Sequence, residues 1–168
     1  FPQSEDFEVE VTDNEVRITG GGEEGVLQGI YWLEEEMESR GGPFLGKGVT
    51  RRQAVWTPRF LYSYVALYGD PLMEPDIDPF PDAYLEKLAC RGVNGVWMQA
   101  VLNTLAPAKH FPEFGAGWEV RLERLGALVR RARKLGVRIY LYLNEPRAMQ
   151  AAFFDKYPEI RGARYGDL

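Results

Sequence analysis

The 168-residue sequence contains a single cysteine, Cys90, and a single histidine, His110. One cysteine excludes an intramolecular disulfide and leaves the redox compartment open. One histidine excludes a zinc site built from several imidazoles, and the residues around His110 offer no partners for a Ser-His-Asp triad. We therefore expect His110 to be structural and Cys90 to pack as a small apolar residue.

Long apolar runs and an excess of basic residues are also missing. No stretch approaches the roughly 20 apolar residues that a transmembrane helix needs. The formal net charge is −5, and both nucleic acids and anionic membranes call for a basic face. We therefore expect neither a nucleic acid nor a membrane as partner. Hydrophobic residues make up 45% of the chain, which is enough for a sizeable core.

The first 48 residues predict an incomplete small α/β unit made of a β-hairpin and one helix. Residues 7–11 and 15–19 alternate apolar and charged or polar side chains around a tight turn, as strands of a hairpin do. Apolar residues then recur at three- and four-residue spacing over about 23–40, which predicts an amphipathic helix. A glycine-rich stretch ends the unit, and residues 49–56 form either one more strand of it or a connector.

From about residue 60 onward, strand patterns alternate with helix patterns. Strands buried on both faces are expected over 60–69, 92–101 and 137–143. Helices are expected over about 80–91 and 118–135, and a short one before Pro158. Repeated βα units of this kind predict a parallel sheet with helical crossovers.

Such a sheet closes either as a doubly wound open sheet or as a barrel. The nucleotide-binding open sheet needs a glycine-rich turn after its first strand, but the turn over 68–76 carries acids that would repel a phosphate. We therefore favour the barrel, which needs about 250 residues when complete. Residues 49–168 are predicted to hold the first three βα units of a TIM-type (β/α)8 barrel. Because the sequence begins at Phe1 rather than Met, we expect a fragment of a longer protein.

The proline-rich segment 70–82 gathers five acidic residues, a composition that raises the question of calcium. It lacks the spacing of a calcium-binding loop, and its prolines restrict its shape. We expect a solvated acidic loop there. No pattern elsewhere calls for a metal or a cofactor, and we expect neither.

Four motifs give the chain a resemblance to a known family. They are the helix residues Gly25, Gly29, Ile30, Tyr31 and Leu33, then Pro58-Arg59-Phe60, Gly92-Val93-Asn94, and the run from Gly136 to Pro146. In this order they resemble the start of family 20 glycoside hydrolases, the β-N-acetylhexosaminidases and their relatives. The resemblance implies a small α/β domain followed by a (β/α)8 catalytic barrel, a carbohydrate substrate, and the remainder of the polypeptide as a partner.

The sequence departs from the family in residues that contact the sugar. Ser63 stands where the family has an arginine, and Trp97 and Gln99 stand in the second strand where it has a histidine. Ala148 replaces a further histidine. These departures predict a divergent branch that acts on another sugar. The family's catalytic Asp-Glu pair ends the fourth barrel strand, so we expect the isolated three-strand chain to be inactive.

Asn144 and Glu145 also resemble the Asn-Glu pair that supplies the acid/base of a large clan of retaining glycosidases. Such chemistry needs a second carboxylate about 5–5.5 Å away for retention, or about 6.5–9.5 Å away for inversion. That clan carries the pair on the fourth strand, whereas Glu145 follows the third strand here. Glu145 is therefore a candidate acid/base, with substrate contact or loop bracing as the favoured alternative, and the catalytic residues stay unassigned.

Barrel enzymes build their sites at the carboxyl ends of the strands. The candidates for substrate binding are accordingly Tyr68, Asp70, Gln99, Asn103, Asn144, Glu145 and Arg147. The alternative for Asp70 and Arg147 is that they cap or brace loops.

Two other functions stay open from the sequence. One is a non-catalytic carbohydrate-binding or structural module, and the other is a self-contained open α/β domain with an unrelated small-molecule function. A partial barrel would leave a bare strand edge and apolar faces, so we expect self-association, such as a homodimer through that edge.

Overall fold

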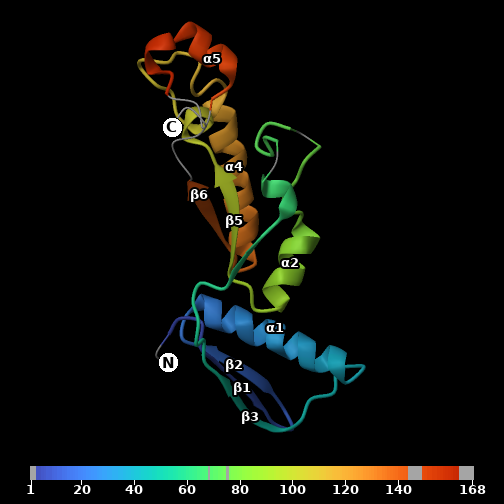
Figure 1. Ribbon diagram of the computed structural model, residues 1–168. Coiled ribbons are helices and arrows are strands. Elements are labelled where there is room, and N and C mark those ends of the chain that lie inside the picture. Colours follow the sequence, from blue (N-terminus) through green and yellow to red (C-terminus); the bar gives the residue numbers. More distant parts are fainter. Residues whose placement is uncertain (1–2, 68, 75, 144–148, 163–168) are drawn as a thin grey trace.

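The computed structural model describes residues 3–67, 69–74, 76–143 and 149–162. Two three-stranded sheets lie one above the other in Figure 1, each with helices on one side. The lower sheet has the order β2-β1-β3 and the upper sheet the order β4-β5-β6. The chain is therefore a mixed α/β protein with two small sheets.

The lower unit is an antiparallel sheet covered by one helix. Its elements are β1 (Phe7–Val11), β2 (Val16–Gly20), α1 (Glu23–Ser39) and β3 (Gly48–Arg52). β1 pairs with both neighbours in antiparallel register. Of the two alternatives for residues 49–56, the pairing makes 49–52 part of a strand of this first sheet.

Helix α1 lies very close to the sheet because of its glycines. A Cβ atom added at Gly25 would lie 2.3 Å from the carbonyl oxygen of Asp6, and one at Gly29 would lie 2.5 Å from Cγ2 of Ile18. The side chains of Phe7 and Val9 are buried under the helix. The G-x-x-x-G spacing in α1 is thus explained by close packing.

The upper unit is a parallel sheet with helical connections. Its elements are β4 (Phe60–Tyr62), the 3₁₀ turn η1 (Tyr64–Leu67), α2 (Asp82–Cys90), β5 (Gly95–Ala100), α3 (Leu102–Leu105), α4 (Trp118–Lys134), β6 (Arg138–Leu143), α5 (Ala151–Lys156) and the 3₁₀ turn η2 (Pro158–Ile160). β5 pairs in parallel with β4 and with β6. The strands follow one another in space as they do in sequence.

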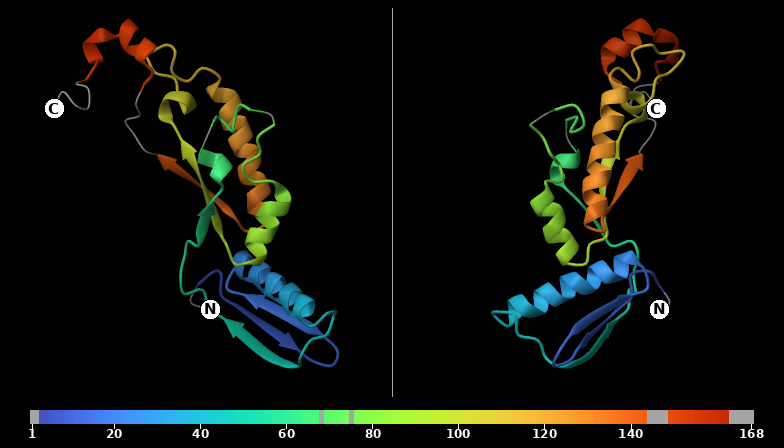
Figure 2. Two further views of the ribbon diagram at one scale, coloured as in Figure 1. Left: turned by 45° about the vertical axis from the view of Figure 1, so that its right-hand side comes forward. Right: turned by 180° about the vertical axis from the view of Figure 1, so that it is seen from behind.

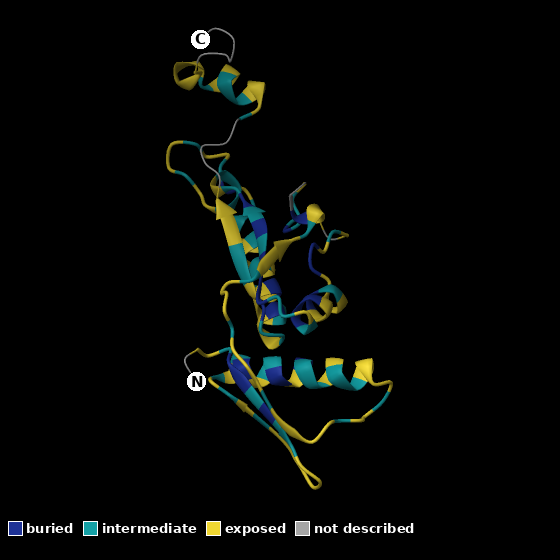
Figure 3. Ribbon diagram, turned by 60° about the horizontal axis from the view of Figure 1, so that its bottom comes forward, coloured by how far each residue is buried: buried dark blue, intermediate teal, exposed yellow. Residues whose placement is uncertain are grey.

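The main core lies between β5 and two helices on the same face of the sheet. Val96 and Met98 of β5 are at most 1% exposed, and they belong to one buried cluster with Leu85 of α2 and Leu128 and Ala132 of α4. The buried residues in Figure 3 concentrate on β1 and where α2 and α4 face β5. Since strand side chains alternate, the remaining residues of β5 point to the opposite face.

The strand predicted over 60–69 is wrong in length and in burial. β4 has three residues, all exposed, and the chain then turns as the N–H of Ala66 donates to the carbonyl of Ser63 at 2.9 Å. The turn buries Ala66 in the core. β6 was likewise expected to be buried, but most of its residues are exposed. β4 and β6 are the edges of the described sheet, and helices cover one face only.

The proline-rich loop is less solvated than its composition predicts. Leu72 and Phe80 are buried in the main core, and Asp78 accepts a hydrogen bond from the N–H of Phe80 at 3.0 Å. Arg131 of α4 pairs with both Asp78 and Asp82 at 2.9 Å. The acidic side chains therefore fasten this loop to helix α4.

Polar side chains join the two units at the amino ends of the parallel strands. Asn94, 5% exposed, accepts from the N–H of Arg59 at 2.6 Å and donates to Glu5 and to Thr57 Oγ1. Arg59 also pairs with Glu5 at 2.8 Å. Figure 2 shows α1 lying across this end of the upper unit, far from α5. The opposite end, where the strands finish, is left for the loops.

Candidate functional site

The face of the upper sheet opposite the helices is built of aromatic rings. We call it the aromatic face; it consists of Phe60, Tyr62, Trp97, Tyr140 and Tyr142. The ring of Trp97 lies 4.8 Å from that of Tyr62 and 5.2 Å from that of Tyr142, measured between centroids. Phe60 stacks on Tyr140 at 5.6 Å. The face thus carries two groups of contacting rings, Tyr62–Trp97–Tyr142 and Phe60–Tyr140.

This face is open over the part of the chain that the structure describes. Phe60, Tyr62 and Tyr142 are each nearly half exposed. Gln99 pairs in register with Tyr142, one pleat nearer the carboxyl ends of the strands than Trp97. An amide carries both a donor and an acceptor, and aromatic rings offer flat apolar area to the C–H faces of a sugar. The arrangement suits a saccharide ring that stacks on aromatics and presents its hydroxyls to an amide.

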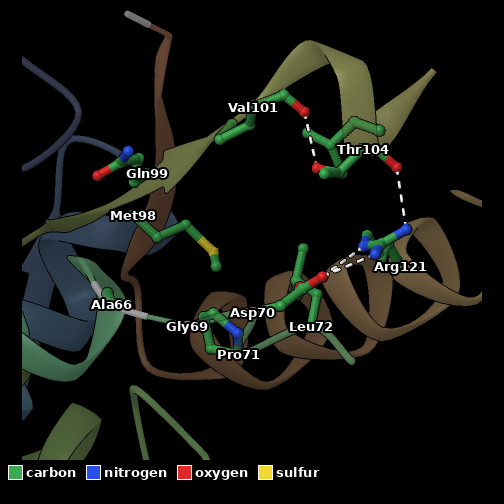
Figure 4. A pocket seen from close by; sticks show the side chains of 12 residues that line it. Ala66, Gly69, Asp70, Pro71, Leu72, Met98, Gln99, Val101, Thr104 and Arg121 are labelled. Carbon is green, nitrogen blue, oxygen red and sulfur yellow. Dashed lines mark hydrogen bonds and ion pairs between the residues drawn. The ribbon is translucent and has the colours of Figure 1, made fainter. Parts of the chain in front are cut away.

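A small cavity on the helix side of the sheet contains Asp70. Its volume is about 140 Å³, below the roughly 300–1,000 Å³ of ligand pockets. Oδ2 of Asp70 lies 2.8 Å from Nε and 2.7 Å from Nη2 of Arg121 on α4 (Figure 4). Arg121 Nη1 also donates to the carbonyl of Thr104 at 3.1 Å and to that of Ala116. Arg121 thereby ties two loops to helix α4.

The predicted site residues are only partly brought together. Asp70, Met98 and Gln99 all line this cavity. The side chain of Met98 points into it beside Asp70, whereas the side chain of Gln99 points away from it (Figure 4). Asp70 and Gln99 therefore lie on opposite sides of β5. The third described candidate, Asn103, lines a different cavity. Its Nδ2 donates to Sδ of Met149 at 3.1 Å. The other four lie outside the described residues: Tyr68, Asn144, Glu145 and Arg147.

Sequence reasoning missed the rings of the aromatic face as site residues. The signal was present, because Phe60 and Tyr62, and again Tyr140 and Tyr142, are aromatic at a spacing of two within predicted strands. Residues two apart in a strand share a face. Arg121 was missed as well, and its contact with Asp70 across 51 positions has no local signature.

Burial favours the neutral form of two titratable groups at the main core, Tyr31 and Cys90. Burial raises the pKa of Tyr31 to about 12, and its hydroxyl donates to the carbonyl of Leu135 at 3.2 Å. Burial also raises the pKa of the Cys90 thiol, with Glu34 and Glu86 adding to the effect. Cys90 packs against the main core. A reactive cysteine needs a lowered pKa, so Cys90 is suited to packing.

Within the described ranges, no group of three or more His, Cys, Asp and Glu side chains is placed to hold a metal ion. No helix in the same ranges is long and apolar enough to cross a membrane.

Comparisons with known proteins give matches in structure alone. No family model and no curated protein matches the sequence. The chain is similar to a GH138 enzyme targeting pectin rhamnogalacturonan II, with a TM-score of 0.65 and 15% identity over 92% of this chain and 20% of that one. The fold is glycoside hydrolase-like. A beta-N-acetylhexosaminidase (TM-score 0.52, 16% identity) and CpGH84B (0.52, 14%) each match 83% of this chain, and 32% and 23% of their own lengths.

These likenesses concern the fold and do not single out family 20. The chain spans between a fifth and a third of the length of the three enzymes. Activity and substrate are therefore matters for proposal.

Proposed function

We propose that this chain is the N-terminal part of a glycoside hydrolase that cleaves an O-glycosidic bond of a carbohydrate. The observation that carries the proposal is the aromatic face, whose rings lead to Gln99 at the carboxyl ends of parallel strands. Barrel enzymes bind their substrates at that end. The similarity in fold to glycoside hydrolases supports the same reading.

The proposed architecture is a partial small α/β unit, ending near residue 48 or after β3, followed by the first three βα units of a (β/α)8 barrel. Two features support it. The strands β4, β5 and β6 are neighbours in sequence order, and α2 and α4 pack together on one face. A doubly wound sheet would instead have helices on both faces. In the barrel, the aromatic face would line the interior.

The proposed relationship to family 20 is that of a divergent branch. Trp97 and Gln99 stand where that family has a sugar-binding histidine, and Tyr142 lies beside them. A histidine replaced by a ring and an amide favours a different sugar. We propose that Gln99, Trp97 and Tyr142 contact this sugar.

The catalytic carboxylates belong, in this proposal, to the remainder of the polypeptide. Glycoside hydrolysis needs two carboxyl groups, one of them with a raised pKa. Near the carboxyl ends of the strands, Asp70 pairs with Arg121 and Glu113 pairs with Lys156. Hydrogen bonds, first from its own backbone N–H, lower the pKa of Glu113, and Arg121 holds Asp70 on the helix side of the sheet. Neither residue is therefore suited to the acid role. Glu145 is the remaining candidate acid/base of this chain.

Hydrolysis of a panel of 4-nitrophenyl glycosides tests the proposal. The 168-residue chain should be inactive, and the longest polypeptide that contains it should hydrolyse at least one member. In that polypeptide, Gln99→Ala should reduce kcat/KM about tenfold or more, the cost of one lost hydrogen bond, whereas Gln53→Ala in the lower unit should not. If the 168-residue chain hydrolyses a glycoside and Glu145→Gln abolishes this activity, catalysis does not belong to the remainder of the polypeptide.

The exposure of the rings also favours a second function, a non-catalytic carbohydrate-binding module. Tyr62 and Tyr142, nearly half exposed, offer a binding surface without further chain. In that case the longest polypeptide would bind glycans and hydrolyse none of the panel.

A further inference from the structure

Two loops at the carboxyl ends of the parallel strands fold against each other into a small lobe. One is residues 103–117, between β5 and α4, and the other is residues 149–161, which contains α5. We call the two together the loop lobe. Figures 1 and 2 show it at the far end of the molecule from α1.

The loop lobe has an aromatic core of its own. The ring of Phe111 lies 5.0 Å from that of Phe114, 5.4 Å from that of Phe153 and 5.1 Å from that of Tyr157. Phe153 in turn lies 5.6 Å from Phe114 and 5.0 Å from Tyr157. Because both loops contribute rings, their relative position is fixed by packing.

Polar contacts reinforce this packing at the surface. Both carboxylate oxygens of Glu113 lie 3.3 Å from Nζ of Lys156, and the hydroxyl of Tyr157 donates to Glu113 at 3.0 Å. Hydrogen bonds, first from its own backbone N–H and then from Tyr157 and Lys156, hold the pKa of Glu113 below its usual value. The carboxylate of Glu113 and the ammonium of Lys156 thus remain an ion pair without net charge over a wide range of pH.

A groove of about 450 Å³ runs between the two loops. Its walls carry the amides of Asn103 and Gln150, the Glu113–Lys156 pair and the ring of Phe153. The volume lies within the range of small-molecule sites. Amides and a mutually neutralised ion pair offer donors and acceptors without net charge, and the ring offers a flat apolar surface. This chemistry matches a neutral, hydroxyl-rich pyranose.

We propose that this groove is an accessory glycan subsite, which binds a neutral saccharide residue of the chain whose other residues lie on the aromatic face. The proposal rests on the proposed function, because it assumes a carbohydrate ligand. Asn103 and Gln150 take hydroxyl groups, Lys156 donates a further hydrogen bond, and Phe153 contacts the C–H face of the sugar. The loop lobe thereby extends recognition beyond the sugar that the sheet contacts.

The test is binding of cellotriose, chitotriose and galactotriose to the longest polypeptide that contains this chain, monitored by heteronuclear NMR. We expect at least one trisaccharide to shift the amide signals of both Gln150 and Gln99. Gln150→Ala and Lys156→Ala should each weaken its Kd about tenfold, since each removes one hydrogen bond. The matched controls Gln53→Ala and Lys47→Ala, exposed residues of the lower unit, should leave Kd unchanged.

The outcomes separate this inference from the function on which it rests. If Trp97→Ala abolishes binding while Gln150→Ala and Lys156→Ala bind like the wild type, the accessory subsite is refuted and the carbohydrate function stands. If none of the three trisaccharides binds, both are refuted for neutral glycans. Circular dichroism of Lys156→Ala detects any unfolding of the loop lobe, and Gln150→Ala, which alters an exposed side chain, provides an independent measurement.

Discussion

Replacing Arg121 tests whether Asp70 braces the fold or serves the ligand. Arg121 is a largely buried side chain, 12% exposed, with two contacts to Asp70 and two to backbone carbonyls. Each hydrogen bond to a carbonyl contributes about 1 kcal/mol, and those to a charged group about 1.5–3 kcal/mol. Asp70 is one-third exposed, so water compensates part of its loss. We expect Arg121→Met to reduce the free energy of unfolding by about 3 kcal/mol.

The assay is urea unfolding followed by tryptophan fluorescence. With a slope of about 2 kcal/mol per M, the loss moves the midpoint by about 1.5 M. Arg121→Lys should fall between wild type and Arg121→Met, because an ammonium cannot reach Asp70 and both carbonyls in the same fixed geometry. Arg130→Met, at an exposed position of the same helix, is the matched control.

A double-mutant cycle then isolates the pair itself. Asp70→Asn should cost about 1 kcal/mol alone and much less in the Arg121→Met background, because contacting residues are coupled. A coupling energy near zero, or an unfolding midpoint of Arg121→Met equal to that of Arg130→Met, would refute the bracing role and return Asp70 to the ligand-binding candidates.

Three further predictions concern other parts of the chain. Between pH 9 and 12 the wild type should lose about 2 kcal/mol more stability than Tyr31→Phe. Burial raises the pKa of Tyr31 to about 12, whereas the unfolded chain releases the same proton near pH 10. Equal losses of the two proteins in urea titrations would contradict this. Gly25→Ala should lower the free energy of unfolding by about 3 kcal/mol and Gly29→Ala by about 1 kcal/mol. The new methyl group meets a backbone carbonyl at Gly25 but only a side-chain methyl at Gly29. A larger loss for Gly29→Ala in thermal unfolding would contradict this packing. The isolated chain should self-associate through its open aromatic face, and Tyr142→Lys should shift it toward monomer in light scattering; a monomer at every concentration would refute this.

The helices could be predicted from the sequence because their signal is local. The apolar period places α1 and α4 within one residue of the expected ends. The strand expected over 60–69 failed for the opposite reason. Its aromatic and β-branched residues favour a strand throughout, but the turn that buries Ala66 depends on a core assembled from distant elements. Local propensity carries no information about such a core.

The place of the candidate site follows from the predicted fold, whereas the contacts within it do not. Parallel strands must end at one edge, so Gln99 and Asp70 were expected there. Which side of β5 each residue faces depends on where the chain turns after β4, and the partner of Asp70 lies on a helix 51 positions away. Spacing alone cannot reveal such a contact.

Residues that join the two units lie apart from residues proposed to contact the ligand. The joint consists of Glu5, Thr57, Arg59 and Asn94. It fixes the lower unit to the amino ends of the parallel strands. The ligand contacts proposed for Gln99 and the loop lobe lie toward the carboxyl ends of the same strands. Substitutions in the loops near Gln150 therefore leave the contacts between the two units unchanged. Under the proposed function, substitutions confined to the loops at the carboxyl ends of the strands would change which glycan is bound and leave this joint intact.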